Sequence, residues 1–293
     1  MKKYVALCFL IITGLINILL INIFNNTNLN ASKELSAPKQ SLTFTEKVND
    51  FPYSIVPKIA ITIIIDDIGE NIGIAKEIWE ICDNITLSII PFKKDSVKIS
   101  EYGARRKLPV MLHMPMEPFG DINDYSHFLT TFQSKEEFFR TLKENLNSLP
   151  YYQGINNHMG SKLTSDFIRL SWLFDFLKIT NLFFIDSRTY KTSEAAEISL
   201  KYNVLTGIRD FFIDNREDEA YILEQLKKAS ALAKKHSYSI AIGHPKRVTV
   251  EALKKFVKNN KITVLPAYQG LKIFKKIEKT RIKGKKFLNI LYE

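Results

Sequence analysis

Hydrophobic and polar positions alternate along the chain with two different periods from residue 59 onward. Short β-branched runs, typical of strands buried on both faces, are separated by longer stretches with the spacing of amphipathic helices. The expected strands lie at 59–65, 85–90, 109–114, 154–157, 182–185, 203–206, 240–242 and 262–265. The expected helices lie between them, at 72–81, 135–146, 165–177, 193–202, 217–235 and 250–257. This order predicts an α/β fold of parallel βα units, a distorted (β/α) barrel of seven or eight strands.

Residues 1–25 predict a membrane anchor. The apolar run from Tyr4 to Phe24 is long enough to cross a hydrocarbon layer of about 30 Å. A buried core helix is the alternative, but the run lies at the extreme terminus and has no polar face. Two lysines precede the run and no basic residue follows it before Lys33, so we expect the amino terminus to stay inside and the rest to be exported. The predicted location is the bacterial inner membrane, single-pass with a periplasmic domain; cleavage near residues 29–32 would instead release a secreted protein.

Composition divides the remainder into three parts. Residues 26–57, rich in Asn, Ser, Thr and Pro, predict a flexible linker; residues 58–270 are the predicted barrel domain, and 271–293 a basic tail. The formal net charge is +11, but residues 272–293 alone hold eight basic and two acidic side chains. Because most of the excess charge is in the tail, we expect no nucleic-acid partner. The tail itself fits either a solvated segment or an amphipathic contact with an anionic membrane surface.

Polar side chains gather where the expected strands end, which is where parallel α/β folds place catalytic groups. They are Asp66 and Asp67, His113, Asn156 with Asn157 and His158, Asp186 with Arg188, and His244. Asp67, His113 and His158 offer one carboxylate and two imidazoles, a ligand set that suits a divalent metal ion, with zinc the expected one. The purely structural alternatives are a helix N-cap for the aspartate pair and hydrogen-bonded loop positions for the histidines.

Five segments in this order also carry a family resemblance. They are 64–69 (IIDDIG), 112–118 (LHMPMEP), 156–161 (NNHMGS), 184–189 (FIDSRT) and 242–245 (IGHP). From about residue 59 to 270 the chain resembles the divergent polysaccharide deacetylases, a branch of the carbohydrate deacetylase superfamily. The resemblance implies a distorted (β/α) barrel and a metal ion held by Asp67, His113 and His158, with Asp66 as the base. Better-known sugar deacetylases carry two histidines four positions apart, whereas here Glu117 stands four positions after His113.

Three further residues have expected roles in such a reaction. His244 arrives from a distant strand end, so we expect it to donate a proton to the leaving amine or to stabilise the oxyanion. Asp186 is expected to orient His244, and Arg188 to pair with Asp66. An internal salt bridge that holds the barrel loops is the structural alternative for Asp186 and Arg188.

Two function classes follow from these features. The first is a membrane-tethered, metal-dependent hydrolase that removes N-acetyl groups from an envelope glycan, with a peptidoglycan-related sugar as the expected substrate. In this reading Asn156 and Asn157 contact sugar hydroxyls or the acetyl group, although both also fit as turn caps. The second is a catalytically silent glycan-binding or envelope-assembly factor on the same barrel, with envelope proteins as partners. The intact set of base, metal ligands and acid favours the hydrolase.

Overall fold

The computed structural model describes residues 57–279. The predicted anchor, nearly all of the predicted linker and the last part of the predicted tail lie outside this range. Among the described residues, no helix has the length and apolar character needed to cross a membrane.

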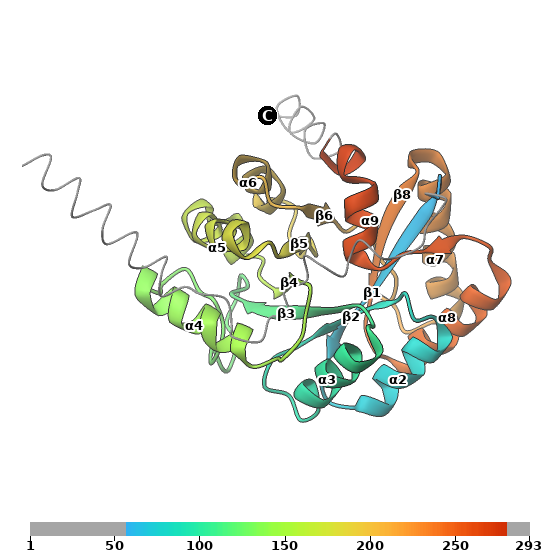
Figure 1. Ribbon diagram of the computed structural model, residues 1–293, viewed down its shortest axis with the longest axis horizontal. Coiled ribbons are helices and arrows are strands. Elements are labelled where there is room, and N and C mark those ends of the chain that lie inside the picture. Colours follow the sequence, from blue (N-terminus) through green and yellow to red (C-terminus); the bar gives the residue numbers. More distant parts are fainter. Residues whose placement is uncertain (1–56, 280–293) are drawn as a thin grey trace, which may run out of the picture. The chain divides into compact units, whose positions relative to one another are not determined.

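The described residues are built around one parallel sheet (Figure 1). Hydrogen-bonded strands follow the order β6-β5-β4-β3-β2-β1-β8-β7, and β9 pairs with the start of β1 off this path. In chain order the strands are β1 (Ala60–Ile68), β2 (Thr86–Ile89), β3 (Val110–Met116), β4 (Gly154–Met159), β5 (Phe183–Asp186), β6 (Thr206–Ile208), β7 (Phe211–Phe212), β8 (Tyr238–Gly243) and β9 (Thr263–Val264). The sheet curls into a half-barrel, which confirms the predicted distorted (β/α) barrel.

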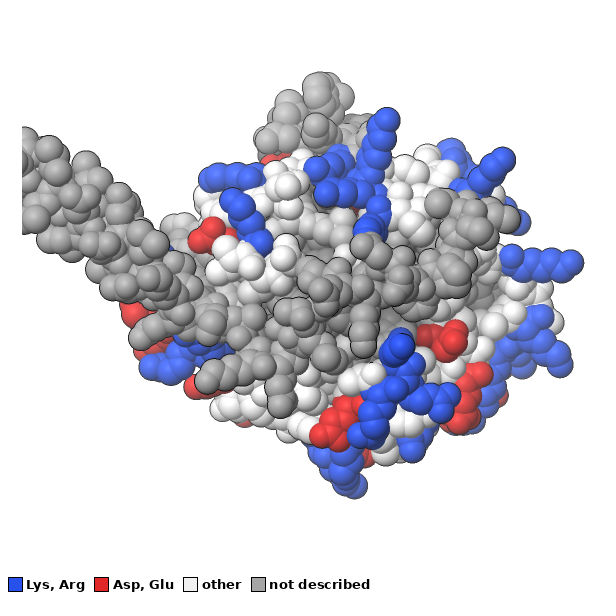
Figure 2. Space-filling view, viewed as in Figure 1, with Lys and Arg blue, Asp and Glu red and all other residues white. Residues whose placement is uncertain are grey.

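Helices alternate with the strands and cover the outside of the curled sheet (Figure 1). They are α2 (Ile72–Ile81), α3 (Ser96–Arg106), α4 (Lys135–Asn147), the short η2 (Leu163–Ser165), α5 (Phe167–Thr180), α6 (Ala195–Tyr202), α7 (Glu219–His236), α8 (Arg247–Asn259) and α9 (Ala267–Ile273). The six expected helices are present, while α3 and α9 were not expected. On the face shown in Figure 2, Lys and Arg side chains are spread over the visible helices with Asp and Glu between them.

β6 and β7 behave as one strand divided between two neighbours. β6 pairs with β5, and β7 pairs with β8. The two residues between them continue both contacts, because the Arg209 amide donates to the Asp186 carbonyl at 3.0 Å and the Asp210 amide donates to the Ile240 carbonyl at 2.8 Å. The covalent chain at residues 209 and 210 therefore joins the β5 side of the sheet to the β8 side.

α9 packs against the amino-terminal end of the barrel. Leu271 is fully buried and Phe274 stacks on the Tyr238 ring with centroids 4.8 Å apart. Both belong to the core cluster that includes the first residues of β1, β5 and β8. Gly270 allows this close approach, since a Cβ there would collide with the Tyr238 hydroxyl. The domain boundary expected at residue 270 thus falls inside α9, and buried residues continue beyond it.

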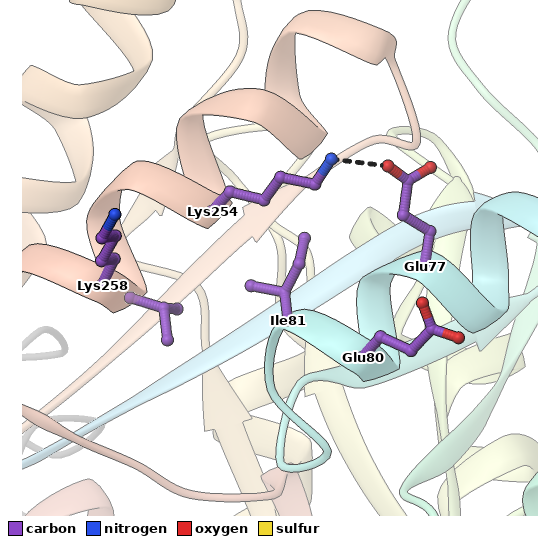
Figure 3. Close-up of a pocket in the computed structure, with 6 residues that line it drawn as sticks. Glu77, Glu80, Ile81, Lys254 and Lys258 are labelled. Carbon is purple, nitrogen blue, oxygen red and sulfur yellow. Dashed lines mark hydrogen bonds and ion pairs between the residues drawn. The ribbon is translucent and has the colours of Figure 1, made fainter.

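A groove between α2 and α8 holds an ion-pair network (Figure 3). Lys254 Nζ donates to Glu77 Oε1 at 2.7 Å, and Arg247 donates to both carboxylate oxygens of Glu77 at 2.7 and 2.9 Å. Since α2 follows β1 and α8 follows β8, these bonds connect positions at least 170 residues apart in the chain. The network holds α2 and α8 together on the outside of the sheet.

Candidate active site

The predicted site residues lie at the carboxyl ends of five strands. Parallel pairing aligns His113 of β3 with Asn156 of β4, and Asn156 with Ile185 of β5. On the other side, Ile65 of β1 pairs with Gly243 of β8, so Asp66 and His244 come directly after a paired position. Residues separated by up to about 180 positions in the sequence therefore meet at one edge of the sheet.

A backbone irregularity brings Asp66 and Asp67 to the same site. In a regular strand two neighbouring side chains point to opposite faces. Here the register between β1 and β2 shifts between Ile65 and Ile68, and Asp67 adopts a left-handed conformation with φ of 56°. Such a bulge re-aims side chains at a strand end, at a conformational cost that surrounding contacts must offset.

Asp67, His113 and His158 form a compact carboxylate–imidazole cluster. Asp67 Oδ1 lies 3.2 Å from His113 Nε2 and 3.0 Å from His158 Nδ1. One ligand atom from each residue lies within 4.8 Å of the other two. Donors at about 2.0 to 2.2 Å from a tetrahedral zinc ion are about 3.3 to 3.6 Å apart, so the two Asp67–histidine distances are close to those around a divalent metal ion.

Charge at the cluster also fits a cation. Burial acts to raise the pKa of Asp67, but hydrogen bonds from His113 and His158 outweigh it and hold that pKa well below its usual range. Asp67 is therefore ionised at neutral pH, as a metal-binding carboxylate must be.

Asn156 connects the cluster to Asp66. This side chain is fully buried, and its Nδ2 donates to Asp66 Oδ1 at 2.7 Å. Its Oδ1 accepts from Ser88 Oγ at 2.5 Å and lies 2.8 Å from His113 Nδ1. Because the Asn156 oxygen is an acceptor, His113 donates an Nδ1 proton to it, and its Nε2 faces Asp67. Asn156 is thus a positioning residue rather than the expected substrate contact.

Asp66 is buried beside the cluster. Only 2% of its surface is exposed, and Oδ2 lies 3.7 Å from His113 Nε2. Burial raises the pKa of Asp66 above its usual value, although His113 and Asn156 act in the opposite direction. The same contact matters to His113: burial lowers its pKa, while the charges of Asp66 and Asp67 outweigh burial and raise it.

His244 faces the cluster from β8 and is oriented by Asp214. Its Nδ1 lies 2.9 Å from Asp214 Oδ1, and its backbone amide donates to Asp214 Oδ2 at 2.7 Å. Thr249 Oγ1 donates to the same Oδ2 at 3.0 Å. The other ring nitrogen, Nε2, lies 3.9 Å from Asp67 Oδ2. Burial lowers the pKa of His244, but the Asp214 carboxylate outweighs it and raises that pKa.

The roles expected for Asp186 and Arg188 differ from what the structure shows. Asp214, and not Asp186, is the carboxylate that holds His244. Asp186 instead accepts the backbone amide of Arg188 at 2.8 Å. The expected partner of Asp66, Arg188, has a left-handed backbone, and the described contacts of Asp66 are with Asn156 and His113. The chain turns after β5, so the Asp186 carboxylate bonds to the backbone of its own loop.

Arg209 and Asn157 also stabilise the loop after β5. The Arg209 guanidinium donates to the carbonyls of Ser187 and Arg188. Asn157 accepts the Ser187 amide at 2.9 Å and donates to the Met159 carbonyl at 2.7 Å. The turn-cap alternative therefore describes the Asn157 contacts.

The region that carries these residues matches a known family. Residues 63–267, well over half of the chain, match the model for the divergent polysaccharide deacetylases. The chain belongs to this family. Every residue predicted for the site lies within the range that matches the deacetylase family.

Similar proteins share the same region. Over 199 residues the chain is 30% identical to the uncharacterized protein YibQ of Escherichia coli K12, and the match covers 68% of this chain and 62% of YibQ. It is also 30% identical over 199 residues to an uncharacterized protein of Haemophilus influenzae, covering 68% of this chain and 71% of that protein. The match thus spans less than two thirds of YibQ. The fold is similar to the crystal structure of the uncharacterized protein ATU2773 from Agrobacterium tumefaciens, with a TM-score of 0.70, 18% identity, and coverage of 74% of this chain and 91% of that one.

Proposed function

We propose that this member of the divergent polysaccharide deacetylases is a metal-dependent hydrolase that removes N-acetyl groups from an envelope glycan, with a peptidoglycan-related sugar as substrate. The observation that supports it most is the convergence of a carboxylate–imidazole cluster, a buried second carboxylate and an aspartate-paired histidine at one strand edge. The export predicted from the leader would bring the domain to that glycan.

Asp67, His113 and His158 would hold the metal ion, with zinc the expected one. Such an ion activates water at neutral pH and polarises the amide carbonyl. The protein's own contribution begins with the fixed orientation of the three side chains. Asn156 holds the His113 ring, and the bulge at Asp67 aims its carboxylate between the two imidazoles.

Asp66 and His244 would divide the proton transfers between them. Asp66 accepts a proton from the attacking water, and its raised pKa makes it a stronger base than an ordinary aspartate. His244 carries a proton at Nε2 toward the site, because Asp214 accepts the hydrogen bond from Nδ1 and stabilises the charged ring. That proton goes to the departing amine.

One observation favours the alternative, a catalytically silent glycan-binding or envelope-assembly factor. Asp66 is almost completely buried, and Asn156 already donates a hydrogen bond to one of its oxygens. A base needs to come within hydrogen-bond distance of the proton that it takes. In the silent alternative Asp66 only orders Asn156 and His113.

Variants of the adjacent aspartates test the proposal. We expect Asp66→Asn to retain the metal ion, since amide and carboxylate are nearly isosteric, and to lose about 10²- to 10⁴-fold in acetate release. Asp67→Asn should lose metal affinity first, because a neutral amide is a poorer ligand. Metal content and acetate release from N-acetylated muropeptides and chitooligosaccharides measure both effects.

The control for these variants is Asp175→Asn, which removes an exposed carboxylate from α5. It should match the wild type in metal content and in acetate release. If Asp66→Asn releases acetate as fast as the wild type, Asp66 is not the base. If the wild type binds the metal ion and the glycan but releases no acetate, the silent alternative is correct.

A further inference from the structure

Exposed and half-buried aromatic side chains lie on the loops that follow β2, β3 and β5, at the strand edge that carries the candidate site. We call this set the aromatic rim; its members are Phe92, Phe119, Tyr125, Phe128, Phe132 and Tyr190. The exposed fractions of Phe92, Phe119, Phe132 and Tyr190 are 50%, 53%, 68% and 39%. Large exposed apolar side chains beside a polar cluster are typical of ligand-binding surfaces.

One part of the rim is a continuous series of ring contacts that starts at the cluster. The His158 ring lies 6.3 Å from Phe128, Phe128 lies 6.1 Å from Tyr125, and Tyr125 lies 5.9 Å from Phe132, measured between centroids. Each contact is edge-to-face. The series therefore leads from a proposed metal ligand to the most exposed ring of the rim.

A second part of the rim crosses the end of β4. The rings of Phe119 and Tyr190 lie 5.0 Å apart, although one follows β3 and the other follows β5. Since β4 lies between those strands, this pair spans the strand that carries His158. Two hydrogen bonds fix it there: the Phe119 amide donates to Ser161 Oγ at 2.7 Å, and Thr189 Oγ1 donates to the Met159 carbonyl at 2.8 Å.

The loop after β3 is held in place by Glu117. This buried carboxylate accepts hydrogen bonds from the amide and hydroxyl of Thr131, both at 2.6 Å, and from Lys162 Nζ at 2.7 Å. Its backbone amide donates to the Leu129 carbonyl at 2.9 Å. These hydrogen bonds hold the base of the loop after β3. The rings on this loop are therefore positioned before a ligand binds, so less conformational entropy is lost on binding.

We propose that the aromatic rim binds a linear glycan over several sugar units, so that the site selects long chains over single sugars or disaccharides. The inference rests on the proposed function, because it assigns the rim to the substrate of the same site. The C–H face of a pyranose ring is apolar and carries partial positive charge, which suits the negative face of an aromatic ring. Two ring sets, one in contact with His158 and the other across the end of β4, give such a chain contacts beyond the sugar at the cluster.

Binding of chitohexaose and chitobiose tests the proposal without any need for turnover. The full chain carrying Asp66→Asn is titrated with each probe by calorimetry, so that the probe is not consumed. We expect chitohexaose to bind at least about tenfold more tightly than chitobiose, because only the longer chain contacts both ring sets. Phe119→Ala and Phe132→Ala should each weaken chitohexaose binding about three- to tenfold, and Phe132→Ala should leave chitobiose binding unchanged.

Two controls separate ring stacking from a general structural effect. Phe132→Tyr keeps the ring and should retain tight chitohexaose binding. Tyr202→Ala removes a partly exposed ring at the end of α6, near the amino-terminal edge of the sheet, and should change neither affinity. Circular dichroism of each variant should match that of the parent, since the two rings to be removed are mostly exposed.

The proposal is overturned if chitohexaose does not bind, if both probes bind equally, or if the ring variants retain full affinity. It is also overturned if the ring variants lose binding to phosphatidylglycerol vesicles but not to chitohexaose, which would assign the rim to a lipid surface. Acetate release by the wild type is measured in parallel. Release combined with length-independent binding refutes the rim alone, whereas ring-dependent binding without release refutes the proposed reaction and keeps the rim.

Discussion

Asn156 organises the candidate site although its amide has no chemical role in the proposed reaction. It contacts Asp66, His113, Ser88 and Ser187 from a fully buried position on β4. Buried polar groups are costly when they lose their partners, so one amide here satisfies groups from four strand ends. The spacing between the proposed base and the proposed metal ligands depends on it.

Removal of this amide should therefore affect both stability and metal affinity. We expect Asn156→Ala to lower the free energy of unfolding by roughly 2 to 4 kcal/mol, because buried partners are left unsatisfied. Metal affinity should fall by about 10- to 100-fold as the His113 ring loses its orientation. Denaturant unfolding and metal titration measure the two effects. Asn260→Ala, which removes one part-buried hydrogen bond to the Phe256 carbonyl, is the control and should cost under about 1 kcal/mol.

At the same scale, sequence patterns showed some site residues and not others. Asp67, His113 and His158 can be predicted together because each lies at the end of a strongly apolar run, and the structure places them in one cluster. The role of Asp214 cannot be predicted in this way, since its partner His244 is 30 positions away and comes from another strand. A contact between two loops leaves no periodic signal, so the sequence does not distinguish Asp214 from Asp186 as the partner of His244.

Among the elements, α3 shows why helix prediction failed in one segment. Its buried positions are Ser96, Ile99, Ser100 and Gly103, which have helical spacing but include a single large apolar residue. Gly103 is small because a Cβ there would collide with Val110. A helix that packs closely through small side chains has no stripe of large apolar residues, whereas α4 and α8 each bury several.

For α9 we predict a clear effect of chain length on stability. A chain that ends at residue 270 lacks Leu271 and Phe274, so its free energy of unfolding should fall by at least about 4 kcal/mol. A chain that ends at residue 279 keeps both side chains and should match the full domain. Denaturant unfolding distinguishes the two. Equal stability of both truncated chains would contradict a structural role for α9.

Point variants of α9 give a matched comparison. Leu271→Ala should lower the free energy of unfolding by about 2 to 5 kcal/mol, whereas Lys272→Ala, which changes an exposed side chain, should leave it almost unchanged.

For the whole molecule, the parallel order of strands and helices was predictable, while the way the barrel closes was not. Apolar runs indicate buried strands, but the two-residue β7 and the division of residues 206–212 between β5 and β8 leave no such run. The predicted anchor and export stay predictions, because residues 1–56 lie outside the described range.

The stability of the whole molecule should depend on pH through the α2–α8 ion pairs. Hydrogen bonds from Arg247, and then from Lys254, lower the pKa of Glu77 from 4.5 to about 2. A carboxyl with a lowered pKa stabilises the fold above its unfolded pKa, and this contribution is lost as the pH falls from about 4.5 toward 2. Glu77→Gln should therefore be less stable than the wild type at pH 6 by up to about 1 kcal/mol, and the difference should shrink by pH 2.

Thermal unfolding between pH 2 and 6 measures that difference. Glu80→Gln removes the same charge from the same helix, while Arg247 and Lys254 pair with Glu77. The control should follow the wild type over the whole range. If the difference in unfolding temperature between Glu77→Gln and the wild type is the same at every pH, protonation of Glu77 does not contribute to the pH dependence of stability.

The link between β6 and β7 is covalent, whereas each neighbouring pair of strands from β5 through β1 to β8 is joined by backbone hydrogen bonds. The proposed metal ligands and His244 lie on or directly after β1, β3, β4 and β8, within the hydrogen-bonded part of the sheet. Because β6 pairs with β5 and β7 pairs with β8, the two residues between them tie the β5 side of the sheet to the β8 side. These two sides cannot separate while the chain is intact, so the distance from His244 to the ligands is limited from both directions round the sheet.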